Sequence, residues 1–267
     1  MKKNNYLAIL ILGLIMVTSC KKSTQADPKP EFQKYSEFII QTEETSNEME
    51  FIGRYIPGNI AQYPDDGFYL GKGKISRKGT TTGQEITIDF ETGGVCTDGK
   101  FRSGKLLIEY NEANFDTMVR PQTYQLGEID VRGNYSIGYV QGSDRLRLNF
   151  IALNGKLTKE GQYTVDFSLS RASEFVSGFA TANDITDDVF NRKELVYNLT
   201  LNVDGKNSLL KVQGLGESKL QFSCSNRYYP VTGQLKVEMA GAGTTTAQNS
   251  FQLTFGTGSC NSVPVIN

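Results

Sequence analysis

The chain has 267 residues, of which 21% are charged, a formal net charge of -1, and neither histidine nor tryptophan. A nearly neutral chain without a basic stripe lacks the electrostatic footprint of a nucleic-acid-binding protein. The absence of histidine excludes Ser-His-Asp triads, histidine general bases and the usual zinc sites. Any catalysis would have to use carboxylates, Lys, Tyr, Ser or Cys.

The first twenty residues have the pattern of an export signal. Two lysines precede an apolar run from Tyr6 to Val17, and small residues lead to Cys20. A positive start, an apolar stretch of about 7–15 residues and small residues before the cleavage site are typical of a secretory signal, and this run is too short to span a bilayer. The ending predicts a bacterial lipoprotein signal peptide in residues 1–19. Cys20 would then be acylated, and its chains would hold the protein on a lipid bilayer.

The next two segments differ in composition. Residues 20–31 are polar and contain two prolines, which predicts a flexible tether after the lipidated cysteine. From Phe32 to Ile52, apolar residues recur at spacings that fit one helical face, and no Gly or Pro interrupts them. This pattern predicts one amphipathic helix. Residues 32–267 are long enough for one large β-rich domain with its own core, and we expect a single domain there.

After about Gly67 the periodicity changes from that of a helix to that of strands. Apolar residues alternate with polar or β-branched residues in segments 85–90, 105–110, 145–150, 162–169, 195–203 and 235–239. Dipeptides such as Asn154-Gly155 and Asp204-Gly205 favour tight hairpin turns. The sequence therefore predicts a mainly β protein, in which an antiparallel meander sheet forms a sandwich or half-open barrel with one face toward a core.

Two segments near the ends of the predicted sheet resemble each other. Segments 79–96 and 243–260 both contain Gly-Thr-Thr-Thr, then a strand that ends in Phe, then Thr-Gly and a Cys. The interval from the first Gly to the Cys is 17 positions in both. We interpret them as two copies of one hairpin unit, an internal repeat.

Three stretches resemble a widespread group of Bacteroidota lipoproteins: Ile86–Lys105, Phe179–Phe190 and Phe255–Asn261. The shared features are turn glycines, strand residues and cysteines, as in Ile-Thr-Ile-Asp-Phe at 86–90. The group is functionally uncharacterised, so the resemblance implies a fold and an outer-membrane location but no activity. Glu91 departs from the pattern, because a Gly often follows the Asp-Phe pair in similar proteins.

Cysteine usage predicts at most one disulfide. With Cys20 acylated, an oxidising compartment leaves Cys96, Cys224 and Cys260 for pairing. The first and third strands of a meander point the same way, so Cys224 and Cys260 are expected near the same edge of the sheet and are the pairing that we expect. Cys96 occupies the matching place in the other repeat and competes for either partner, and a chain without a disulfide is the third alternative.

Few residues suggest chemistry. Asp184–Asp188 is the densest acidic cluster, but it lacks the spacing and the bidentate Glu of an EF-hand, which favours a solvated loop or helix cap over a calcium site. Asp65-Asp66 is better read as a turn than as half of a glycosidase carboxylate pair. Tyr228-Tyr229-Pro230 is better read as a turn than as a ligand-presenting tip. Phosphate-binding loops and nucleophile motifs are missing, so no catalytic residue, metal or cofactor is predicted.

One modification signal remains. Asp116-Thr117-Met118 matches the short Asp-Thr/Ser-apolar pattern on which bacteria of this kind attach O-glycans, with a chance match as the alternative. Thr117 is therefore the candidate O-glycosylation site.

The expected protein is a non-enzymatic lipoprotein of the outer membrane, bound to the bilayer through acylated Cys20, with a binding or structural role. Its orientation toward the periplasm or the cell surface is left open, as is its ligand or protein partner; nucleic acid is not expected. One alternative is a glycan hydrolase, which needs two facing carboxylates in a cleft, one with a raised pKa. The other is a carrier with an unfilled apolar cavity.

Overall fold

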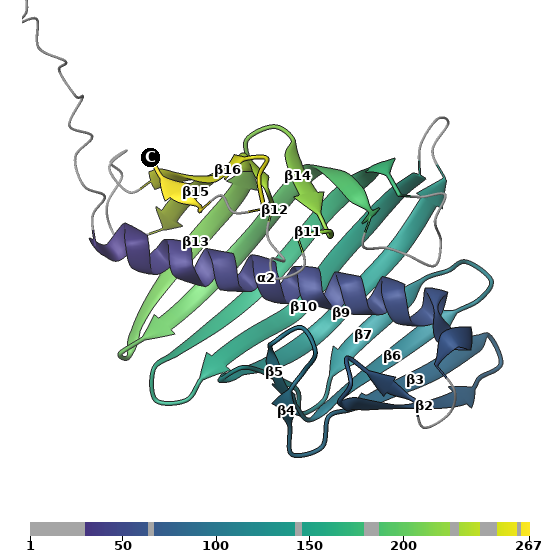
Figure 1. Cartoon of the computed structure of the whole chain (residues 1–267). Coiled ribbons are helices and arrows are strands. Elements are labelled where there is room, and N and C mark those ends of the chain that lie inside the picture. The colour runs from purple at the N-terminus through teal and green to yellow at the C-terminus, as the bar shows by residue number, and fades with distance from the viewer. Residues whose placement is uncertain are drawn as a thin grey trace, which may run out of the picture.

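The structure is a computed structural model that describes residues 30–63, 67–141, 146–178, 187–224, 230–240, 250–260 and 263–267. Within these ranges one long α-helix crosses one face of a single large sheet (Figure 1). The helices are α2 (Pro30–Gly58) and the short 3-10 helix η1 (Ile60–Gln62). The strands of the first half are β1 (Phe68–Tyr69), β2 (Gly73–Gly79), β3 (Gly83–Asp89), β4 (Gly94–Val95), β5 (Phe101–Ser103), β6 (Lys105–Asn111), β7 (Thr117–Pro121), β8 (Gln125–Leu126) and β9 (Ile129–Gln141). Those of the second half are β10 (Leu146–Lys159), β11 (Tyr163–Ser177), β12 (Val189–Val203), β13 (Lys206–Gly214), β14 (Ser218–Gln221), β15 (Thr232–Ala240), β16 (Ser250–Thr257) and β17 (Val265–Ile266).

The sheet is an antiparallel meander. Its pairings run β1-β2-β3-β6-β7-β9-β10-β11-β12-β13-β15-β16-β17. The short strands β4, β5 and β8 form a side extension on β9, and β14 lies between β12 and β15. The predicted mainly β meander with one N-terminal helix is confirmed. It is a single open sheet rather than a sandwich.

The central strands are longer than predicted because bulges let them continue. Asn154-Gly155, predicted as a hairpin turn, instead lies inside β10, where the register with β9 and β11 shifts. Asn154 has a φ of 52°, and a Cβ at Gly155 would lie 2.4 Å from the ring of Phe167. The dipeptide is therefore a β-bulge, in which a residue with positive φ and a close backbone approach are accommodated without ending the strand. Asp204-Gly205 does form the predicted turn, between β12 and β13.

The two copies of the hairpin repeat occupy opposite sides of the sheet. In the first copy the strand is β3, which pairs with β2, and β2 lies next to edge strand β1. In the second copy the strand is β16, which pairs with β15 and lies next to edge strand β17. The Gly-Thr-Thr-Thr turn of this second copy lies outside the described residues.

Apolar contacts hold both ends of α2 on the sheet. Near its start, Phe32 stacks on Phe251 with ring centroids 4.9 Å apart, and Phe38 meets the edge of Tyr163 at 4.8 Å. Toward its end, a Cβ at Gly53 would lie 2.4 Å from Ile137 of β9, so the helix backbone approaches the sheet closely at this glycine. The contacts at the two ends of α2 lie on the same face of the sheet, which we call the inner face.

The middle of α2 differs from the predicted amphipathic helix. Between Thr42 and Glu50, polar side chains on every side of the helix are buried, among them three glutamates with at most 1% exposure. An amphipathic helix keeps such residues in water. Here they are buried because the inner face of the sheet supplies charged partners for them.

Candidate functional site

The first buried ionic group lies between the middle of α2 and strands β11 and β12. Glu43 and Glu50 of the helix face Arg171 and Arg192 of the strands, and all four side chains have no exposure to solvent. Arg192 Nη1 lies 3.2 Å from Glu43 Oε2, and Arg171 Nε donates to Glu50 Oε2 at 3.1 Å. Arg171 also lies over the ring of Phe150 at 4.2 Å. We call these four charged residues the double-arginine cluster.

Strand alternation and a bulge aim both arginines at the helix. In β11, Arg171 continues the inward series of Val165, Phe167 and Leu169. In β12, Glu194 has a φ of 56° at the point where the pairing with β11 shifts. Arg192 therefore faces inward, although regular alternation back from Leu195 would turn it outward. A bulge is a common way to re-aim a side chain.

The arginines of this cluster stabilise the charge of Glu50, although burial and the neighbouring Arg171 lower the pKa of Arg192 to about 10. Burial alone would raise the pKa of Glu50, but the guanidinium groups of Arg171, Arg192 and Arg54 outweigh it, and the pKa of Glu50 is lowered. Glu50 is thus an ionised carboxylate held by arginines. A carboxylate in this state is a poor general acid, because it gives up its proton well below neutral pH.

A second ionic group surrounds Glu48 of α2. Arg102 of β5 donates from Nε to Glu48 Oε1 at 2.9 Å and makes a two-pronged pair with Asp98 at 2.7 and 2.8 Å. The Tyr124 hydroxyl donates to the same Glu48 oxygen at 2.6 Å. Gly99, with a φ of 80°, closes the turn that places Asp98 beside Arg102. This Glu48 cluster explains the Cys-Thr-Asp-Gly-Lys-Phe-Arg stretch at 96–102 as a structural motif that receives the helix.

A third group surrounds Arg54 in the last third of α2. Its guanidinium pairs with Asp188 and lies over the rings of Phe190, Phe175 and Phe222 at 4.6, 5.1 and 5.8 Å. Asp188 is 2% exposed. The expectation that the acidic cluster is a solvated loop is therefore wrong for Asp188, which is buried because Arg54 neutralises it. Asp187 is exposed, and the rest of the cluster lies outside the described residues.

All three groups are closed to substrates, since their charged side chains are almost fully buried. Their role is structural: opposite charges meet in a buried interface, which fixes the position of α2 along and around its axis. Breaking such a pair by removing one partner typically costs about 3–5 kcal/mol, because a buried charge is left alone. They therefore position the helix and leave binding to another part of the surface.

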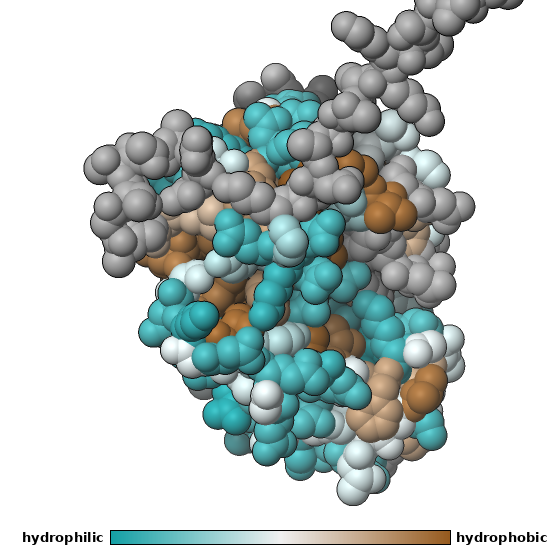
Figure 2. Space-filling model, turned by 90° about the vertical axis from the view of Figure 1, so that its left-hand side faces the viewer, coloured by the Kyte–Doolittle hydropathy of each residue, from teal (hydrophilic) through white to brown (hydrophobic). Residues whose placement is uncertain are grey.

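An accessible recess lies beside the first turns of α2. It has a volume of about 540 Å³ and is bounded by the helix, the β8–β9 turn, the β10–β11 hairpin and the β12–β13 hairpin. This volume is within the range of about 300–1,000 Å³ that is common for small-molecule sites. Figure 2 looks onto this end of the molecule and shows a largely hydrophilic surface with hydrophobic side chains between the hydrophilic ones. We call the recess the hairpin groove.

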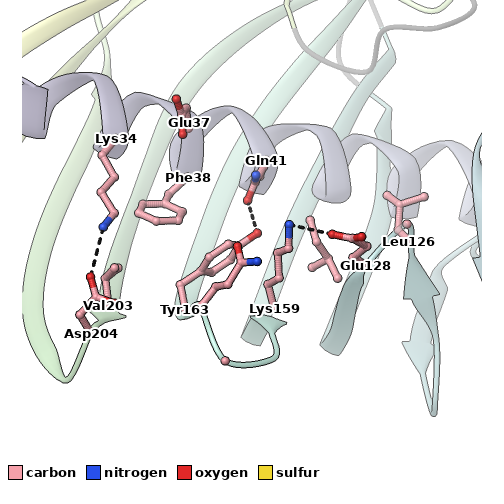
Figure 3. Close-up of a pocket in the computed structure, with 14 residues that line it drawn as sticks. Lys34, Glu37, Phe38, Gln41, Leu126, Glu128, Lys159, Tyr163, Val203 and Asp204 are labelled. Carbon is pink, nitrogen blue, oxygen red and sulfur yellow. Dashed lines mark hydrogen bonds and ion pairs between the residues drawn. The ribbon is translucent and has the colours of Figure 1, made fainter.

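The hairpin groove combines an apolar floor with paired charges. Phe38 and the half-buried Tyr163 lie at its centre, and the Tyr163 hydroxyl donates to Gln41 at 2.6 Å (Figure 3). To one side Lys34 pairs with Asp204 at 3.7 Å, and to the other Lys159 pairs with Glu128 at 2.7 Å. Both pairs are well exposed. Since exposed ion pairs contribute only about 0–1 kcal/mol, a charged ligand can replace one partner at little cost.

The cysteines are not part of the groove lining. Cys224 and Cys260 form a disulfide with their Cα atoms 5.3 Å apart, and Cys96 is free and buried. Burial raises the pKa of the Cys96 thiol, and the opposing effect of Arg102 does not reverse this. The disulfide fixes Cys224, two residues after Phe222, which lies over Arg54, so it supports the third ionic group.

Of the other predicted sites, Thr117 is buried and the rest lie outside the described residues. Thr117 is 3% exposed and lies in β7 beneath α2, so the folded chain does not present its hydroxyl to a glycosyltransferase. Cys20 with the signal and most of the tether, Asp65-Asp66 and Tyr228-Tyr229 lie outside the described residues. The residues of the hairpin groove were not among the predicted sites, and no motif joins them in the sequence.

Comparisons with known proteins found no match to a protein-family model, to a curated protein or to a solved structure. Within the described ranges, no three Cys, Asp or Glu side chains are grouped to hold a metal ion. The described part of the chain also contains no helix with the length and apolar character needed to cross a membrane.

Proposed function

We propose that this chain is a lipid-anchored protein of the bacterial outer envelope that binds a small ligand in the hairpin groove and catalyses no reaction. The observation that carries the binding role is the groove: an accessible recess of small-molecule size with an apolar floor and exchangeable charges. The lipid anchor is supported by the signal pattern that ends at Cys20.

The architecture suits a binding role. The walls of the groove are one long helix and three hairpins of a continuous sheet, and buried ion pairs fix the helix against that sheet. A site on such rigid elements is pre-organised, so little ordering entropy is lost when a ligand binds.

The two alternatives have less support from the geometry. A retaining or inverting glycosidase needs a carboxylic acid with a raised pKa. In the groove, hydrogen bonding to Lys159 lowers the pKa of Glu128, which is the opposite direction. A carrier of an apolar ligand needs an empty apolar space on the inner face, and α2 occupies that face.

Native mass spectrometry of the full-length protein, extracted from its own membrane in mild detergent, tests the binding role. We expect a small-molecule adduct on the wild type and its loss in Gln162→Trp, because Gln162 is exposed at the groove and an indole would fill it. Thr200→Trp is the matched control, since Thr200 is exposed on the outer face of β12. No adduct, or equal loss in both variants, would overturn the proposal.

The anchor is tested separately. Metabolic labelling with an alkyne fatty acid is expected to mark the wild type and Cys96→Ala but not Cys20→Ala. Label that persists on Cys20→Ala would exclude attachment through this residue.

A further inference from the structure

We propose that the ligand of the hairpin groove is the zwitterionic head group of a membrane phospholipid, with a phosphate and a primary ammonium, as in phosphoethanolamine. This inference deepens the proposed function and rests on it for the location of the groove beside a bilayer. It is argued from the charges of the groove, from its floor and from its place along the chain.

The charges of the groove call for a ligand with both signs. Each side of the groove carries one lysine and one carboxylate, and Tyr163 and Gln41 lie between the two pairs, whereas Glu37 points away from them (Figure 3). An anion alone would pair with Lys159 and leave Glu128 without its partner. A zwitterion places its phosphate at Lys159 and its ammonium at Glu128, so that both members of the opened pair keep a neighbour of opposite sign.

The floor of the groove suits the part of a lipid that joins the head group to the chains. Phe38 is 4% exposed and Tyr163 is half-buried, so the ring surface that is open between the ion pairs is mainly that of Tyr163. The C–H groups of a glycerol backbone would cover this surface. A purely inorganic anion would leave it in water.

The location places the groove near the bilayer. Ten residues join Cys20 to Pro30, where α2 begins, and a chain of that length reaches at most about 35 Å. Lys34 is one helical turn farther on, about 6 Å along the axis. The acyl chains on Cys20 would thus keep the groove within reach of phospholipid head groups.

Titration of the lipid-free chain from Lys21 onward with soluble sn-glycero-3-phosphoethanolamine tests the inference, because every described contact lies within residues 30–267. Backbone amide shifts of Gly127 and Gly161, which line the groove, report binding. We expect saturable shifts at both glycines. We expect binding to weaken about fivefold in Lys159→Ala and in Glu128→Gln, the effect of losing one exposed ion pair.

The matched controls are Lys156→Ala and Asp166→Asn, which break an exposed ion pair of 3.6 Å on the outer face between β10 and β11 and should leave the affinity unchanged. Inorganic phosphate and ethanolamine, titrated alone, should each bind more weakly. Absent shifts, equal binding of phosphate alone, or equal effects of the outer-face variants would each overturn the head-group assignment. Because the lipid-free chain is used, this outcome is independent of the labelling test of Cys20.

Discussion

The two regions of α2 are held to the same sheet by different physics. Around its first turns the helix rests on aromatic rings, and its charged residues form exposed pairs, as between Lys34 and Asp204. From Glu43 to Arg54 four of its five charged residues are buried and form ion pairs, as between Glu50 and Arg171, and the fifth, Glu44, is half-buried. Exposed pairs are weak and can exchange partners, whereas a buried charge that loses its partner is strongly destabilising. One end of the helix can therefore form a binding groove while the rest fixes the fold.

The largest expected effect comes from breaking the double-arginine cluster. Arg171→Met should lower the free energy of unfolding by about 3–5 kcal/mol, because Glu43 and Glu50 would then share Arg192 alone. Lys159→Met, at the groove, should lower it by at most about 1 kcal/mol. Urea unfolding monitored by circular dichroism measures both. Equal losses would break the distinction between the two regions.

Removal of the disulfide is expected to have a slightly smaller effect. The sequence separation between Cys224 and Cys260 is 36, and closing a loop of this length stabilises the folded state by about 3–4 kcal/mol. Cys224→Ser should lose that amount in urea unfolding under non-reducing conditions. A reducing agent should weaken the wild type and leave this variant unchanged; a variant that still responds would indicate another pairing.

A smaller effect is expected at Gly53, where α2 approaches the sheet closely. Alanine favours a helix over glycine by about 1 kcal/mol. In Gly53→Ala, however, the new methyl group would meet Ile137 at 2.4 Å and Val119 at 2.7 Å. Overpacking of about 1–3 kcal/mol should outweigh the propensity, for a net loss of about 1 kcal/mol in thermal unfolding. Gln33→Ala, on the exposed first turn, is the control, and a more stable Gly53→Ala would show that the helix is free to shift.

The acid limb of the stability profile gives the most specific test. The pKa of Glu50 is lowered in the folded chain from its ordinary value of 4.5. The contribution of Glu50 to the free energy of unfolding is therefore complete above its pKa in the unfolded chain. This contribution is lost as the pH falls through the lower pKa of the folded chain. Glu50→Gln should be less stable at neutral pH and should flatten the pH dependence below about 5. Glu31→Gln, in the first turn, should keep the slope of the wild type.

The sequence predicted the meander because apolar alternation marks each strand. It predicted the central strands too short because charged residues at inward positions interrupt that alternation. The alternation appeared to stop after Leu169 and to begin only at Leu195, whereas β11 and β12 extend to Ser177 and from Val189. The next inward residues along these two strands are Arg171 and Arg192. A charged residue at an inward position was itself the available signal of a buried partner on α2.

The hairpin groove could not be predicted from the sequence. Its residues come from the helix and from three separate hairpins, and they meet because of the curvature and register of the sheet. Neither property follows from local periodicity. The disulfide was predictable in outline, since the meander order brings Cys224 and Cys260 to one edge, but its competition with Cys96 could be resolved only by the fold.

The most direct test of the two-region account is the response of individual tyrosine side chains to ligand. Tyr163 lies in the hairpin groove, whereas Tyr124 bonds Glu48 in a buried ionic group. In a chain with isotope-labelled tyrosine, sn-glycero-3-phosphoethanolamine should shift the ring resonances of Tyr163 saturably and leave those of Tyr124 in place. Shifts at Tyr124, or an unchanged Tyr163 at saturating ligand, would contradict the assignment of binding to the groove and of structure to the buried charges.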